Sequence, residues 1–157
     1  MKFLVTKEWQ RAPFLKMLMG GVALFLLLFL ATDVVLHHFQ TGVSFSRTSE
    51  ILFGNEAAFV DPVPLGTLLL WVHIDLFAGM LTVLILSAIA IRLSSSAGKS
   101  TVWLHLLSLP ALLAPITLTV AYLTSMQWMV VLWLGCFMLW HIMGVALCVV
   151  ILRRVWR

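Results

Sequence analysis

The sequence predicts an all-α integral membrane protein with four transmembrane helices in an up-down-up-down antiparallel bundle. Of its 157 residues, 62% are hydrophobic and only 10% are charged, and a soluble domain of this size cannot bury so much apolar surface. Four apolar runs are long enough to cross the hydrocarbon core of a bilayer. Short connections between the last three runs favour antiparallel neighbours. We therefore expect residues 1–157 to form a single membrane domain.

The four predicted spans are separated by polar or proline-containing segments. They cover residues 17–38, 65–93, 102–123 and 128–152. A basic start before an apolar run is also typical of a signal peptide, but the first run is long and no small-residue cleavage motif follows it. We interpret it as an uncleaved transmembrane helix. Within the third span, Pro110 and Pro115 each remove a backbone donor, which predicts a kink.

Two segments outside the spans have a predicted structure of their own. Residues 1–16 alternate basic with apolar side chains, so we expect an amphipathic N-terminal segment that lies along the membrane interface. Residues 39–64 form the one substantial loop. Within this loop, the pattern from Ser46 to Phe53 predicts a short helix that ends at Gly54.

The basic residues predict the orientation of the bundle. Nine of the ten Lys and Arg residues lie in the N-terminal segment, between residues 92 and 99, or after residue 152, while Arg47 alone lies in the 39–64 loop. The positive-inside rule then places both termini in the cytoplasm of a bacterial-type inner membrane and the loop outside. The net charge of +4 is thus accounted for by membrane topology rather than by nucleic-acid binding.

The histidines are candidate ligands of haem iron. The five are His37, His38, His73, His105 and His141. His73 and His141 lie inside the second and fourth spans, which are diagonal in a four-helix ring, so we predict that they hold one haem b as axial ligands. Gly144, one turn from His141, would leave room for the flat macrocycle. The apolar residues beside both histidines are equally typical of ordinary core positions.

A second pairing remains open. His37 or His38 together with His73 would hold a haem near the external face, so that one or two haems fit the pattern. Neighbouring residues on a helix point about 100° apart, so only one of His37 and His38 can face the core. Asp33, one turn earlier, favours His37. His105 lies near the inner end of its span, and we interpret it as an interface residue.

Asp33 and Asp75 are candidate proton-transfer or quinone-site residues. An ionisable side chain inside a span is costly unless it is paired, hydrated or ligated. Asp33 can reach His37 four residues later. Asp75 is two positions from His73 and points to roughly the opposite face, so it must meet another helix, another subunit or water. We expect His73 to face inward toward a cofactor and Asp75 to face a neighbour, where the alternative role is a packing hydrogen bond.

These residues predict a haem b-binding membrane subunit of a redox complex, which transfers electrons between the quinone pool and a partner subunit or an external redox protein. The alternative is an accessory or anchor subunit of a larger membrane complex without its own cofactor. A third reading is a proton-coupled or metal-ion carrier that uses Asp33, His37, His73 and Asp75, although four spans without an internal repeat are few for a carrier. We expect an electron-transfer or anchor subunit rather than a self-contained enzyme.

Overall fold

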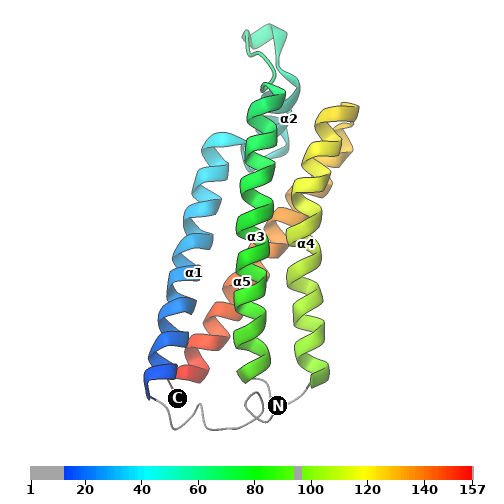
Figure 1. Ribbon diagram of the computed structural model, residues 1–157. Helices are drawn as coiled ribbons and strands as arrows, with labels where there is room; N and C mark the ends of the chain where they lie inside the picture. The colour runs from blue at the N-terminus through cyan, green and yellow to red at the C-terminus, as the bar shows by residue number, and fades with distance from the viewer. Residues whose placement is uncertain (1–12, 94–96, 157) are drawn as a thin grey trace.

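The computed structural model describes residues 13–93 and 97–156, and it confirms the predicted all-α membrane bundle (Figure 1). Its elements are α1 (Pro13–Gln40), α2 (Phe45–Phe53), the 3-10 helix η2 (Glu56–Ala58), α3 (Leu65–Leu93), α4 (Ala97–Thr124) and α5 (Gln127–Val155). Most of the predicted interfacial segment 1–16 lies outside the described residues. The remaining helices therefore define the architecture.

Four of these helices are long and apolar enough to span a membrane. The spans are α1, α3, α5 and residues Val102–Thr124 of α4. Helix α4 continues through both of its prolines. Pro115 has no N–H to offer the carbonyl of Ala111 one turn earlier, while Thr119 Oγ1 donates to the carbonyl of Pro115 at 2.8 Å. Hydrogen-bonding side chains and close neighbours allow prolines inside membrane helices.

The four spans form a ring that is nearly open on one side. Helix α5 packs against α1 and α4, and α4 packs against α3, whereas α1 and α3 have little direct contact. In Figure 1, α5 runs behind the other helices at a slant, from the lower end of α1 to the upper part of α4. The seam between α1 and α3 is consequently the most weakly closed part of the bundle.

The core of the bundle depends on close approaches between helices. At Gly144 of α5, an added Cβ would lie 2.9 Å from Cδ1 of Leu30 and 3.8 Å from Cδ1 of Leu107. Leu30 is fully buried and Leu107 nearly so, so side chains of α1 and α4 fill the space that Gly144 leaves open. The structure therefore differs from the expectation that a macrocycle uses this space.

The short helix α2 covers one end of the bundle, which we call the α2 end. The side chain of Ser44 accepts a hydrogen bond from the N–H of Arg47 and begins the helix. Gly54 ends it with a φ of +78°, in the left-handed region that favours glycine. Leu52 of α2 is buried against the bundle. Tyr122 of α4 donates its hydroxyl to the carbonyl of Val63 at 3.0 Å and ties the end of the loop to the bundle.

Candidate functional site: a buried Asp–His cluster

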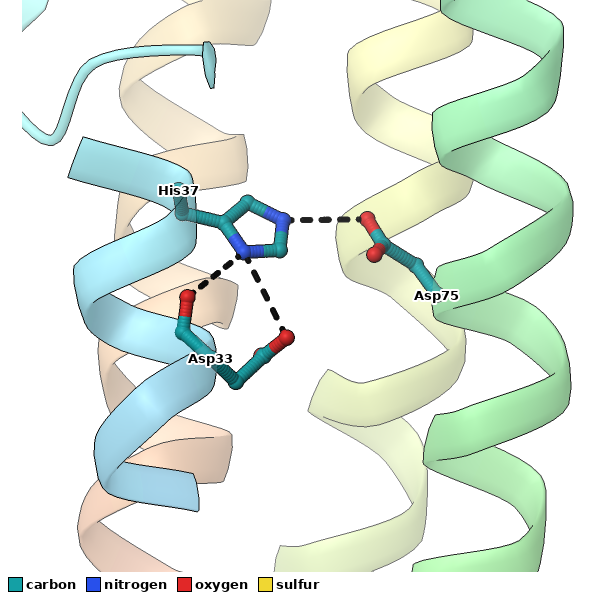
Figure 2. A group of neighbouring side chains, drawn as sticks. All are labelled: Asp33, His37 and Asp75. Atoms are coloured by element: carbon teal, nitrogen blue, oxygen red, sulfur yellow. Dashed lines mark hydrogen bonds and ion pairs between the residues drawn. The ribbon is translucent and has the colours of Figure 1, made fainter. Parts of the chain in front are cut away.

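Two aspartates and two histidines from three helices meet inside the bundle. Asp33 and His37 come from α1, Asp75 from α3 and His141 from α5; we call these four residues the Asp–His cluster. Figure 2 shows the part that joins α1 to α3, in which the imidazole of His37 points from α1 toward Asp75. The cluster thus links α1 and α3 across the seam where their own packing is weakest.

Helix geometry accounts for the positions of these side chains. Asp33 and His37 are four residues apart and therefore share one face of α1. Asp75 lies ten residues into α3, about 15 Å from the α2 end of that helix. His141 lies fourteen residues into α5, about 21 Å from its start. His37 is closer to a helix end, because α1 ends at Gln40. All four residues lie within helices that are long and apolar enough to span a membrane.

An unbroken series of close polar contacts connects the cluster. Nε2 of His37 lies 3.2 Å from Oδ2 of Asp75, and Nδ1 of His37 lies 3.6 Å from Oδ1 of Asp33, an ion-pair distance. The other oxygen of Asp33, Oδ2, lies 3.0 Å from Nε2 of His141. Asp33 therefore bridges the two histidines, and the order of the series is Asp75, His37, Asp33, His141.

Backbone carbonyls determine which nitrogen of each ring carries a hydrogen. Nδ1 of His37 lies 3.0 Å from the carbonyl oxygen of Asp33, and Nδ1 of His141 lies 2.8 Å from the carbonyl oxygen of Phe137. A carbonyl oxygen can only accept, so each Nδ1 must donate. In a neutral imidazole Nε2 is then an acceptor, yet in both residues it faces a carboxylate oxygen, which is also an acceptor when ionised.

Each of these two Nε2–carboxylate contacts therefore requires one shared proton. The proton can sit on the imidazole, giving an ion pair, or on the carboxyl group, giving a neutral pair; in both cases the pair has no net charge. Loss of the proton would leave two acceptors in contact and a net negative charge in apolar surroundings, which is strongly unfavourable. Each of the two contacts is thus a hydrogen bond only when one of its two partners is protonated.

Aromatic side chains of α5 enclose the histidines. The ring of Phe137 lies between them, with ring centroids 4.7 Å from His37 and 4.2 Å from His141. Trp133 stacks on Phe137, and Trp140 meets the edge of His141. The side chains of both histidines are nearly inaccessible, at 4% and 6% exposed, whereas those of Asp33 and Asp75 are 16% and 19% exposed. The aspartates are therefore the accessible members of the cluster.

A small cavity lies beside the cluster, at the centre of the bundle. Its volume is about 20 Å³, and its lining includes Asp33, His37 and Asp75, so it has room for one water molecule. Ala111 and Pro115 of α4 also line it. The carbonyl of Ala111 lacks its usual helical hydrogen-bond donor, because Pro115 has no N–H. A water in this cavity would have both donors and acceptors around it.

The structure does not bring His73 and His141 together, contrary to our expectation. His73 is exposed on the outer face of α3, where it lines a groove of about 450 Å³ together with residues of α4 such as Ser108. His73 and Asp75 do point to opposite faces, but Asp75 is the one that faces inward. The physical reason is a partner, because Asp75 meets His37 of α1 inside the bundle.

The remaining predicted site residues lie at different depths and faces. His37 is 3% exposed and belongs to the cluster, whereas His38 and His105 are exposed. Pairing of His37 with His73 is not found either, since His37 contacts Asp75 on the opposite face of α3. Sequence reasoning paired Asp33 with His37 but missed its bond to His141, 108 positions away. The available signal was only that both residues are ionisable and lie inside spans.

A haem between His73 and His141 does not fit this arrangement. Leu30 fills the space beside Gly144, Phe137 lies against His141, and the central cavity has only the volume of a water molecule. Both nitrogens of His141 also have hydrogen-bond partners within the protein. Haem binding through other residues stays a prediction.

A metal ion is the other ligand to consider for the cluster. One ligand atom from each of Asp33, His37 and Asp75 lies within 4.8 Å of the other two. However, the two carboxylates approach different nitrogens of His37, as Figure 2 shows, and each of these nitrogens already has a hydrogen-bond partner, the backbone carbonyl of Asp33 or the carboxylate of Asp75. The geometry is that of a proton-sharing network. No protein-family model, curated protein or solved structure matches this chain, so the site is interpreted from its own geometry.

Proposed function

We propose that this multi-pass membrane protein binds and relays protons through the Asp–His cluster, as a subunit of a membrane redox complex. The observation that carries the proposal is the continuous contact series from Asp75 through His37 and Asp33 to His141. Series of Asp and His side chains inside membranes typically serve as proton relays. The exposed fractions favour the aspartates as the groups that exchange protons with their surroundings.

The number of protons supports a role beside the quinone pool. The two Nε2–carboxylate contacts of the cluster hold two shared protons, and interconversion of a quinone and its quinol consumes or releases two protons with two electrons. A neutral cluster can pass these two protons to a reduced quinone only if each is replaced from the surroundings, because an emptied pair would carry a net negative charge. Neutral storage is favoured because an uncompensated charge there is costly.

The wider assignment follows from the charge distribution and from the packing. We assign both termini to the cytoplasm of a bacterial-type inner membrane, because nine of the ten basic residues lie in the sequence before residue 17, between residues 92 and 99 or after residue 152. The electrons of the complex require a redox centre, which we assign to a partner subunit, since the cluster is closely enclosed by side chains. A haem b held by this chain would instead appear in the absorption spectrum of the purified protein.

Asp75→Asn tests the relay directly. The carboxamide can donate a hydrogen bond to Nε2 of His37, so that the shared proton is no longer required. We expect ¹⁵N NMR of labelled histidines in bilayers to show His37 of the variant as a neutral ring with hydrogen on Nδ1 only. We also expect a potentiometric titration of the purified protein to detect about one exchangeable proton fewer per chain.

Asp61→Asn is the matched control. Asp61 is exposed in the loop after η2, so its loss should remove an ordinary surface carboxyl and leave the histidine signals unchanged. Wild-type protein in which both buried histidines are neutral and in which Asp33 and Asp75 are ionised would contradict the proposal. Unchanged His37 signals in Asp75→Asn would contradict it equally, because the proton would then not be shared with Asp75.

A further inference from the structure

An apolar groove follows the seam between α1 and α3. Its volume is about 590 Å³, and it runs along the half of the bundle away from α2. Its walls are the side chains of Phe14, Met17, Leu18, Gly21, Val22, Phe25, Leu26 and Phe29 on α1 and of Phe77, Ala78, Leu81, Thr82 and Ile85 on α3. Thr82 alone among these has a polar side chain, and it is buried. The groove exists because α1 and α3 pack against α5 and α4 rather than against each other.

One end of this groove lies next to the small cavity beside the Asp–His cluster. Phe29 and Ala78 line both the groove and the water-sized cavity beside the cluster. Phe29 is four residues before Asp33 and Ala78 is three residues after Asp75, so each shares a helix face with its aspartate. The two aspartates are also the more exposed members of the cluster. A molecule lying in the groove would therefore have its inner end next to these carboxyl groups.

An apolar groove with carboxyl groups next to its inner end suits an amphiphilic ligand, whose hydrocarbon part lies along the groove and whose polar part lies within the membrane. The groove suits a long flexible hydrocarbon chain, but lipid tails are as apolar as its walls, so the chain alone gives little selectivity. Selectivity must come from hydrogen bonds at the inner end. A phospholipid cannot provide them, because its headgroup stays at the interface and its tail would present a methyl group to Asp75.

We propose that the groove between α1 and α3 binds a lipid-soluble quinone, with its isoprenoid tail between the helices and one ring oxygen next to Asp75. This proposal rests on the proposed function, since it names the molecule that exchanges protons with the cluster. A quinol hydroxyl can donate to the carboxylate of Asp75, and a quinone carbonyl can accept from the same group when it is protonated. The cluster therefore offers a partner to both redox forms.

Gly21→Leu tests the groove without disturbing the cluster. A Cβ added at Gly21 meets no atom within 4 Å, so the larger side chain extends into the groove without a clash in the core. Gly135→Leu is the control, because Gly135 on α5 is equally open at its Cβ and does not line the groove. Both variants place the same apolar side chain on a lipid-facing helix surface.

The readout is tryptophan quenching in nanodiscs of a synthetic phospholipid, titrated with a short-tailed benzoquinone or naphthoquinone analogue. Trp133 and Trp140 line the small cavity beside the cluster, so a bound quinone ring should quench them. We expect saturable quenching in the wild type and in Gly135→Leu. In Gly21→Leu the dissociation constant should rise at least about tenfold, which corresponds to about 1.4 kcal/mol.

Equal, unsaturable quenching in all three proteins would overturn the quinone proposal and identify the groove as a surface filled by ordinary lipid. The proton titration of Asp75→Asn without quinone tests the relay separately. If Asp75→Asn titrates as many protons as the wild type while quinone binding is saturable, only the proposed function is overturned. If Asp75→Asn titrates one proton fewer but quenching is not saturable in the wild type, only the assignment of the groove is overturned.

Discussion

At the scale of single residues, Asp33 has the central place in the site. It is the one member of the cluster that contacts both histidines, with Oδ1 at 3.6 Å from His37 and Oδ2 at 3.0 Å from His141. Asp75 contacts His37 alone. Buried polar groups gain from each hydrogen bond and lose more when a partner is left unpaired. Loss of either aspartate should therefore lower the stability of the bundle.

Asp33→Leu removes the hydrogen-bond partner of Nε2 of His141, while Nδ1 of His37 keeps the backbone carbonyl of residue 33, so we expect the free energy of unfolding to fall by about 1–3 kcal/mol. Asp75→Leu frees Nε2 of His37 in the same way and should lower it by a similar amount, about 1–3 kcal/mol. Unfolding of the purified variants in mixed micelles by increasing fractions of denaturing detergent measures both losses. Unchanged stability in either variant would show that its aspartate does not satisfy a buried histidine.

At the scale of elements, α2 shows how local backbone geometry positions a loop over the bundle. Gly54 ends α2 with a φ of +78°, and an added Cβ would lie 2.9 Å from the carbonyl oxygen of Val60. Both the left-handed conformation and the close carbonyl require glycine. The hydrogen bond from Val63 N–H to the carbonyl of Ile51 then returns the chain toward α3.

Gly54→Ala should therefore destabilise the α2 end by about 1–3 kcal/mol, through backbone strain and the carbonyl contact. Hydrogen exchange should accelerate over residues 45–63 while the spans remain protected. Gly66→Ala provides the comparison, because Gly66 lies within α3 and its Cβ would meet no atom within 4 Å. Alanine there should be neutral or slightly stabilising, and equal behaviour of the two variants would exclude strain at Gly54.

At the scale of the whole molecule, the distribution of charge and the open seam define how the bundle sits among its neighbours. Among the residues that the structure describes, Arg47 is the single Lys or Arg at the α2 end, and it pairs there with Glu50 at 2.8 Å. At the opposite end, Arg154 of α5 donates to the carbonyl of Leu93 of α3 at 2.9 Å. Arg154 therefore contributes to the packing of α5 against α3 as well as to the positive charge of this end.

The proposed orientation predicts the accessibility of introduced cysteines in a Cys136→Ala background. Glu56→Cys, exposed in η2 at the α2 end, should react with a membrane-impermeant maleimide in intact cells whose outer membrane is permeabilised. Trp156→Cys, 75% exposed at the opposite end, should react only after the inner membrane is opened. The reverse pattern would place the termini outside and contradict the assignment from basic residues.

Much of the fold could be predicted from the sequence alone. The apolar content required a bilayer, and the lengths of the apolar runs gave helices close to the observed α1, α3, α4 and α5. The glycine after residue 53 indicated where the short helix ends. These features depend on local composition and on backbone conformation, which the sequence records directly.

The inward face of α3 was decided only by the tertiary structure. This helix is apolar on all sides, so no hydrophobic periodicity indicates whether His73 or Asp75 points into the bundle. Asp75 faces inward because His37 of α1 is there to share a proton with it, and the link from Asp33 to His141 depends on how α5 crosses α1. Sequence determined which residues are buried in the membrane; packing between helices determined which of them meet.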